Sequence, residues 1–305
     1  MLEFSCLFGK KIFYKKYIKS KIRKLKIINT ISEFIELRKT LSQKISLVPT
    51  MGSIHEGHIS LVETAKKYGD IVIATIFVNP IQFNNLEDYN SYPKSFDKDV
   101  ENLEKNGVDI LFCPSITEVY PKEFDTTVRV TYLSDVLEGK YRKGHMEGVA
   151  TIVTKLLNIT LPDYAVFGEK DYQQLLLIKS FVRDLNIPVK IIQSKTIRDK
   201  YGLALSSRNI KLNSNEKLSA CEIVKALRAG VEKIISGQKK SGEIINFITK
   251  YLSSFESVKI EYVSIRNPHN FEVIDQIYDE FVILIAVFVG EVRLIDNMIF
   301  LVENE

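Results

Sequence analysis

Two histidines three residues apart are the first candidates for chemistry in this sequence. His55 and His58 belong to the stretch 49–58, PTMGSIHEGH, which follows an apolar run and precedes a helical pattern. Peptide N–H groups at a helix N-terminus are unpaired and attract phosphate, and Gly52 and Gly57 would let a nucleotide approach the backbone closely. One histidine near one glycine is typical of an ordinary helix cap. Two of them at a strand-to-helix junction favour a ligand-binding turn, although the reaction stays open.

Two later loops carry cations that suit a triphosphate. Lys170 stands in the turn 168–171, where a predicted strand meets a helix, and from such a place a lysine can reach bound phosphates. The segment 205–209 offers two hydroxyl groups beside Arg208, whose guanidinium matches phosphate oxygens. Each loop alone is more typical of a solvated helix start or cap, so neither by itself establishes a phosphate-binding site.

Side-chain amides near these loops could recognise a small hydroxy acid. Gln82 follows Asn79 in the loop after a predicted strand, and Gln173 and Gln174 follow the lysine turn. An amide both donates and accepts hydrogen bonds, so it can orient hydroxyl and carboxylate groups. Gln82 could equally bond its own loop backbone. The basic segment 142–145 either adds positive charge near the same rim or forms a plain surface turn.

Several nucleotide-dependent chemistries are not supported by these motifs. The sequence has no Gly-rich loop ending in Gly-Lys-Ser/Thr, no GxGxxG and no serine nucleophile elbow. Two histidines at a helix N-terminus, a lysine and an arginine instead favour the stabilisation of charge on an α-phosphate during nucleotidyl transfer.

Alternating strand and helix patterns predict an α/β fold with a parallel sheet. The predicted strands are 26–28, 45–48, 70–78, 108–113, 126–132, 164–167 and 189–193. Since open parallel sheets bind ligands beyond the carboxyl ends of their strands, we expect one rim to gather the polar loops. These loops are 49–58, 79–83, 168–174 and 202–209.

The remaining patterns predict helices, loops and a second domain. Ser32 is the expected cap of the first helix. Loops are predicted at 84–92 and 137–148, and helices at 93–106 and 149–157. Beyond about residue 213 the pattern indicates a small α+β domain. Its expected helices are 216–235 and 243–255, and its expected strands are 259–265, 281–288 and 291–294.

Charge is distributed unevenly along the chain. Residues 1–26 hold nine Lys and Arg and one acid, whereas residues 27–305 hold 33 basic and 37 acidic residues. This basic extension could be an organellar transit peptide, an arm for membrane or nucleic acid, or an extension without function. The mildly acidic body argues against nucleic-acid binding beyond the extension. We therefore divide the chain into the extension, a domain at 27–210 and a domain at 211–305.

Two further features concern compartment and membrane. The three cysteines are far apart and form no CxxC pair, which indicates a reducing compartment and neither a disulfide framework nor a zinc site. The longest apolar run, 281–289, has strand length and is too short to span a membrane. We expect a cytoplasmic protein, with organellar targeting by residues 1–26 as the alternative.

Five ordered motifs resemble the pantothenate synthetase (pantoate–β-alanine ligase) family. They lie at 49–58, 77–83, 144–149, 167–174 and 202–209, and the resemblance runs from about residue 27 to the end, including RLIDN at 293–297. The histidine turn alone would indicate only the broader H-x-G-H nucleotidyltransferases, which remain the alternative function. A non-catalytic nucleic-acid or membrane binder acting through the extension is the remote alternative.

The resemblance implies a Rossmann-like domain with a small C-terminal lid domain, a homodimer, and ATP as co-substrate. Mg²⁺ would be held mainly by ATP phosphates, with no protein metal site. The implied reaction forms enzyme-bound pantoyl adenylate and pyrophosphate, after which β-alanine attacks and releases pantothenate and AMP. The family's proton donor corresponds to His58, and His55, Lys170 and Arg208 would assist on the phosphates.

Binding residues carried over from the family are ATP contacts and pantoate contacts. The ATP contacts are Met51, Gly52, Ser53, Ile54, His55, Glu56, Gly57, His58, Gly168, Glu169, Lys170, Asp171, Ile197, Leu205, Ser206, Ser207 and Arg208. Gln82 and Gln174 would hold pantoate, with Gln82 also near β-alanine. Lys94, Met146 and Tyr201 depart from the family pattern, and Tyr201 would change the anchoring of the loop that closes over ATP.

Overall fold

The computed structural model describes residues 24–93 and 95–300, except the side chain of Leu86. Nearly all of the basic extension, and the departure at Lys94, therefore lie outside the described residues. In the described part, no helix is long and apolar enough to cross a membrane.

Six parallel strands form the first sheet, in the order β1–β4–β3–β2–β5–β6. Their bounds are Lys26–Ile28, Ile45–Thr50, Ile71–Ile76, Ile110–Phe112, Tyr164–Gly168 and Lys190–Ser194 for β1 to β6. The predicted Rossmann-like sheet is thus confirmed. Chain order reverses between β2 and β5, which pair only at Ser46–Tyr164 and Leu47–Ala165. Beyond these pairs the two strands separate, so a crevice opens at their carboxyl ends.

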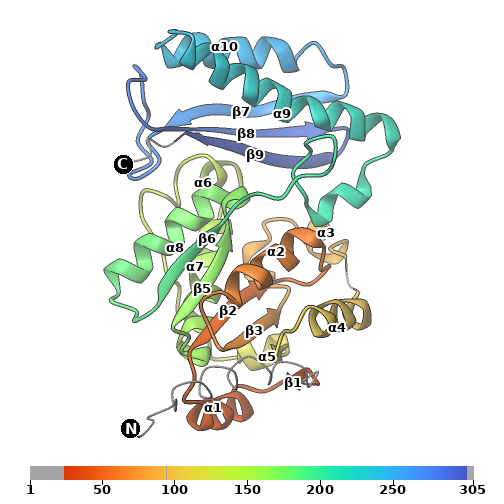
Figure 1. The fold of residues 1–305 in the computed structure, drawn as a ribbon, viewed down its shortest axis with the longest axis vertical. Helices are drawn as coiled ribbons and strands as arrows, with labels where there is room; N and C mark the ends of the chain where they lie inside the picture. The colour runs from red at the N-terminus through yellow and green to blue at the C-terminus, as the bar shows by residue number, and fades with distance from the viewer. Residues whose placement is uncertain (1–23, 94, 301–305) are drawn as a thin grey trace, which may run out of the picture.

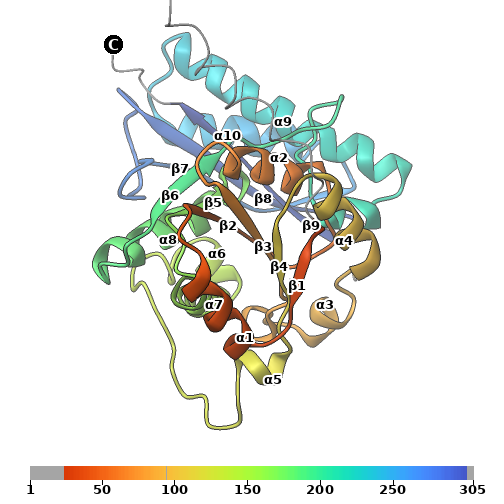
Figure 2. The ribbon, with the colours of Figure 1, turned by 60° about the horizontal axis from the view of Figure 1, so that its bottom comes forward.

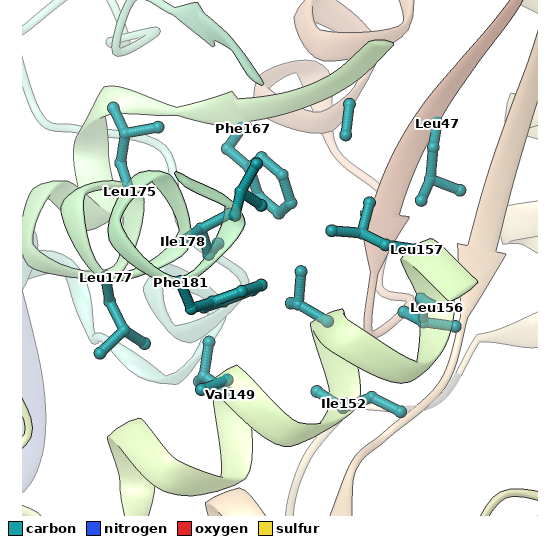
Figure 3. Packing of buried hydrophobic residues seen from close by; sticks show 14 of the residues in the cluster. Leu47, Val149, Ile152, Leu156, Leu157, Phe167, Leu175, Leu177, Ile178 and Phe181 are labelled. Atoms are coloured by element: carbon teal, nitrogen blue, oxygen red, sulfur yellow. The ribbon is translucent and has the colours of Figure 1, made fainter. Parts of the chain in front are cut away.

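Helices cover both faces of this sheet (Figures 1 and 2). Their bounds are Ile31–Thr40, Glu56–Ala65, Leu86–Asn90, Phe96–Lys105, Ile116–Val119, Glu138–Tyr141, His145–Thr160 and Tyr172–Asp184 for α1 to α8. Apolar side chains of α1, α7 and α8 pack with Leu47 and Phe167 on one face, as Figure 3 shows for α7 and α8. Those of α2 and α4 pack with Val48 and Val166 on the other face. Burial on both sides explains the almost purely apolar strands.

The C-terminal part is an antiparallel sheet, β7–β8–β9, with two helices. Its elements are α9 (Ser214–Ile235), α10 (Ser241–Leu252), β7 (Val258–Arg266), β8 (Phe281–Val289) and β9 (Val292–Phe300). Val282, Leu284 and Ala286 of β8 pack into the core of α7 and α8, and the alternate residues of β8 pack against α9 and α10. The sheet therefore lies between those two helices and the first domain (Figure 1).

Four local predictions were wrong. Thr30, not Ser32, caps α1, because its hydroxyl accepts the Glu33 N–H. Residues 126–132 form no strand. Val128 and Val130 pack against the core that contains α7, and the Val128 N–H donates to the Thr151 hydroxyl. The predicted loop 84–92 contains α3.

The predicted loop 137–148 contains α6 and the first turn of α7. Its glycines had suggested a loop, but two of them permit close backbone contact. A Cβ at Gly139 would stand 2.1 Å from the Ser134 carbonyl oxygen, and one at Gly148 would stand 2.6 Å from Gln82 Cα. These helices therefore need glycine for packing, which a sequence pattern cannot distinguish from turn formation.

Candidate functional site

A cavity of about 240 Å³ lies at the carboxyl ends of β2 and β5. The four predicted rim loops all contribute to its lining, and so does Gln174 at the start of α8. The predicted site residues that line it are Met51, His55, Gly57, His58, Gln82, Gly168, Lys170, Asp171, Gln174, Ile197, Leu205, Ser206, Ser207 and Arg208. The topology thus brings together residues that are up to 157 positions apart, from Met51 to Arg208.

The other predicted ATP contacts are placed around this cavity and do not line it. Ile54 is buried in the core between α2 and α4, and Glu56 is exposed. The Glu169 carboxylate accepts a hydrogen bond from Gln193. Gly52 and Ser53 form the turn that precedes α2. Their peptide N–H groups are already bonded within the protein, that of Gly52 to the Thr50 hydroxyl at 3.2 Å and that of Ser53 to Asp99.

The two histidines form a reciprocal cap at the start of α2. His55 Nδ1 accepts a hydrogen bond from the Gly57 N–H at 3.1 Å, and His58 Nδ1 accepts one from the His55 N–H at 3.3 Å. Each neutral ring therefore carries its hydrogen on Nε2. The ring centroids are 4.1 Å apart. These hydrogen bonds at Nδ1 hold both rings in place and leave each Nε2–H as a donor. Both histidines line the cavity.

Both histidines are uncharged at neutral pH. Burial, followed by the nearby charge of Lys170, lowers the pKa of His55 to about 4. Burial, with further contributions from His55 and Lys170, lowers the pKa of His58 to about 3. The rings can stabilise developing negative charge as hydrogen-bond donors without carrying a charge of their own.

A buried carboxylate holds the turn that carries these histidines. Gly52 and Ser53 have φ values of 82° and 52°, a conformation that is costly for serine. Asp99 of α4 compensates, since its carboxylate accepts hydrogen bonds from the Ser53 N–H at 2.8 Å and the Ile54 N–H at 2.7 Å. Asp99 was not among the predicted site residues. The available signal was its place one helical turn before Leu103 in the predicted helix 93–106, because the two residues share the buried face of α4.

The cations of the site have acidic partners nearby. Lys170 lies in the short 3-10 helix η3 (Glu169–Asp171), and its Nζ is 3.8 Å from Asp171 Oδ1. Arg208 lies in η4 (Ser207–Lys211), and its Nη2 is 2.9 Å from Asp88 Oδ2. Both cations are partly exposed, so they can exchange these partners for phosphate oxygens.

Gln82 is oriented by a chain of buried amide and hydroxyl groups. Tyr120 donates to Asn79 Oδ1 at 2.8 Å, and Asn79 Nδ2 donates to Gln82 Oε1 at 3.0 Å. The Gln82 amide nitrogen is thereby directed to Met51 Sδ, 3.0 Å away. Gln173, also considered as an amide for a hydroxy acid, does not line this cavity. Its buried amide nitrogen donates to the carbonyls of Leu133 and Val136.

Arg142 and His145 of the basic segment 142–145 line the cavity, whereas Lys143 and Gly144 between them are exposed. Arg142 Nη1 lies 2.9 Å from His145 Nε2, and His145 Nδ1 lies 2.8 Å from the Gln82 carbonyl oxygen. A guanidinium can only donate, so His145 Nε2 accepts and its Nδ1–H donates to Gln82. Burial lowers the pKa of His145 to about 3. This neutral ring fixes Arg142 at the cavity wall.

Three histidines that are partly or fully buried make stability sensitive to acid. The pKa values of His55, His58 and His145 are lowered from 6.5 to about 4, 3 and 3, chiefly by burial. Below about pH 6.5 the unfolded chain therefore binds more protons than the folded one, and the free energy of unfolding falls. We expect Tm to fall from about pH 7 to about pH 5, with a shallower fall in His145→Gln. A flat wild-type Tm over this range would contradict the assignment.

Two departures from the family pattern are described by the structure. Met146 is buried in the core of the first domain. Tyr201 is 62% exposed, and its loop is held by Asp199, which accepts the backbone N–H groups of Tyr201 and Leu203. The anchoring of this loop therefore does not use the Tyr201 side chain. Across residues 24–93 and 95–300, no group of three or more His, Cys, Asp or Glu could hold a metal ion.

Comparison with known proteins places this site in a family context. The model of the pantoate–β-alanine ligase family matches residues 25–299. A pantothenate synthetase of Thermoanaerobacter pseudethanolicus is 45% identical over 272 residues, covering 89% of this chain and 96% of that one. The crystal structure of pantothenate synthetase from Thermus thermophilus superposes with a TM-score of 0.85 at 37% identity, covering 90% of this chain and 98% of that one.

A third similar protein is known with ligands. The pantoate–β-alanine ligase of Francisella tularensis, solved in complex with βγ-ATP and β-alanine, has a TM-score of 0.74 at 38% identity. The match covers 90% of this chain and 97% of that one.

Proposed function

The chain belongs to the pantoate–β-alanine ligase family, and on that premise we propose which side chains carry out its reaction. It condenses pantoate with β-alanine using ATP, a step of pantothenate biosynthesis. The observation that carries our proposal is the convergence of two neutral histidines, Lys170 and the Ser206–Arg208 loop on one cavity. We set aside the broader H-x-G-H nucleotidyltransferases, because the family model matches nearly the whole chain.

The first step of the proposed mechanism activates pantoate. An oxygen of its carboxylate attacks the α-phosphorus of ATP, the bond to the bridging oxygen breaks, and pyrophosphate leaves. Negative charge builds up on the phosphate oxygens during this step. The Nε2–H groups of His55 and His58 and the cations Lys170 and Arg208 would stabilise that charge. Since the pKa of His58 is about 3, it would act as a neutral hydrogen-bond donor.

Gln82 and Gln174 would position pantoate, and the second step would consume the adenylate. Both amides line the cavity with the histidines, and Gln82 is fixed by Asn79. The uncharged amine of β-alanine attacks the acyl carbon, the bond to the phosphate oxygen breaks, and AMP leaves while the amine proton passes to solvent. Enclosure of the adenylate would limit its hydrolysis.

Four further properties belong to the same proposal. ATP would bring Mg²⁺, held mainly by its phosphates and by water. Of the nearby carboxylates, Asp171 is paired with Lys170 and Asp88 with Arg208. We also propose a homodimer and a cytoplasmic location, both on the family resemblance, with 27–210 and 211–305 as the two domains. Light scattering of the purified chain would measure its mass in solution and so test the homodimer.

One assay tests the reaction and its order. Purified protein with ATP, pantoate and β-alanine should form AMP, and AMP formation should require both organic substrates. With ATP and pantoate alone, the enzyme should exchange labelled pyrophosphate into ATP, because the adenylate forms reversibly before the amine enters. AMP formation without pantoate, or no AMP with all substrates present, would refute the assignment.

A further inference from the structure

Residues of β9 in the C-terminal domain contact both loops that carry the phosphate-binding cations. β9 is an edge strand of its sheet and packs against η3 and η4, which bear Lys170 and Arg208. We propose that Asp296 and Asn297 are positioning residues that set the geometry of these loops for the adenylation step. This inference rests on the proposed roles of Lys170 and Arg208.

Asn297 holds the turn that carries Lys170. Its Nδ2 donates hydrogen bonds to the carbonyl oxygens of Glu169 and Lys170, each at 2.9 Å. Carbonyl oxygens only accept, so the amide nitrogen must face them and both of its hydrogens are used. η3 is a single 3-10 turn, and no side chain of the described residues caps its N-terminus. Its conformation therefore depends on an amide supplied by the other domain.

Asp296 holds the loop that leads to Arg208. Its carboxylate accepts two hydrogen bonds from Arg198, at 2.6 Å and 2.9 Å, a bidentate pair that fixes orientation as well as distance. Arg198 also donates to the Gly202 carbonyl at 3.1 Å, and the Leu205 N–H donates to the Ile197 carbonyl at 2.9 Å. The closed segment 197–205 leads directly into Ser206–Arg208, so its position sets theirs.

The two residues act on the loops, and neither lines the cavity of the histidines. Asp296 lines an adjacent cavity of about 320 Å³ whose wall also includes Lys170 and Arg208, and Asp296 and Asn297 are both only 5% exposed. Successive side chains of a strand point to opposite faces, which is how neighbours on β9 reach two different loops. The positions of Lys170 and Arg208 therefore depend on the position of the C-terminal domain.

A double-mutant cycle separates positioning from general stability. In the full chain, Asn297→Leu should lower pantoate-dependent ATP–pyrophosphate exchange by about 10- to 100-fold, the range expected for a small misplacement of catalytic groups. In a Lys170→Gln background the same change should cost less than about threefold, because the group that it positions is already gone. Full additivity of the two losses would overturn the proposal.

Further variants keep the test decisive. Asn297→Ser, whose hydroxyl can donate to one carbonyl only, should give a smaller loss, and it carries the cycle if Asn297→Leu does not fold. For the second loop, Asp296→Asn should lower exchange in wild type and much less in an Arg208→Gln background. Equal losses in both backgrounds would contradict positioning of Arg208.

The matched control breaks another contact between the domains. Tyr132→Phe removes a hydroxyl that bonds the Phe271 carbonyl at 3.2 Å and Arg266 Nη1 at 3.0 Å, far from both loops in sequence. Exchange should stay within about twofold of wild type. A loss as large as that of Asn297→Leu would show that any weakened domain contact suffices, and would overturn the proposal. Absence of exchange in the wild type would instead refute the proposed function.

Discussion

Replacing His58 by asparagine is expected to lower kcat by about 10²- to 10³-fold while the fold survives, the range for losing one charge-stabilising donor. The His58 ring has two separable roles. Its Nδ1 accepts the His55 N–H and caps α2, whereas its Nε2–H is available to the substrate. An asparagine Oδ1 occupies nearly the place of Nδ1, so His58→Asn keeps the cap and removes the donor.

His58→Ala is the informative comparison. It removes the cap as well as the donor, so it should lower kcat similarly and destabilise the fold by about 1 kcal/mol more than the asparagine variant. Steady-state AMP formation and thermal unfolding of the two proteins measure the two effects independently. Turnover of His58→Asn close to wild type would refute the catalytic role of this ring.

Replacing Lys170 by glutamine is expected to slow adenylation by about 10²-fold or more, because a positive charge facing the phosphates is lost. The variant has a second expected result, which does not depend on the proposed reaction: a change in the histidine pKa values. The charge of Lys170 contributes to the lowered pKa of both His55 and His58. Removing that charge should raise both pKa values, although burial, the larger cause, should keep them below 6.5.

Two measurements and one control test this expectation. Pantoate-dependent pyrophosphate exchange reports the first step, and NMR titration of the histidine rings reports the pKa values. Lys66→Gln is the matched control, since Lys66 is the C-cap of α2 and pairs on the surface with Glu63 of that helix. That control should leave both readouts unchanged. Histidine pKa values that do not move in Lys170→Gln would show that Lys170 is not close to the rings in solution.

The sheet and the rim could be predicted from sequence because their signals are local. Runs such as 71–76 are almost purely apolar, as a strand covered on both faces must be, and three of the four predicted rim loops, 49–58, 79–83 and 168–174, follow a predicted strand directly. The rule that parallel strands present their carboxyl ends at one edge then brings the loops together. The glycines at 139 and 148 misled the same reasoning, because close packing and chain reversal use the same residue.

The contacts of the supporting residues were not predictable, because their partners are distant in the sequence, although Asn297 itself lies in the motif 293–297. Asp99 acts on peptide N–H groups 45 and 46 residues away, and Asn297 acts on carbonyls 127 and 128 residues away. Backbone groups have the same chemistry at every position, so no sequence motif marks such a contact. His145 likewise shows its neutral tautomer only once Arg142 and the Gln82 carbonyl are seen on either side of it.

The sequence by itself therefore determined the fold class and the family, and it supplied the candidate residues for phosphate and pantoate. These features could be predicted because strand patterns and short motifs consist of residues that are neighbours in the sequence. Only the tertiary structure decided how those residues are held. In the folded chain, burial lowers the pKa of both histidines, and the Asp99 carboxylate accepts hydrogen bonds from their turn. A strand of the C-terminal sheet contacts both loops that carry Lys170 and Arg208. Burial and long-range hydrogen bonds arise only when the chain is folded.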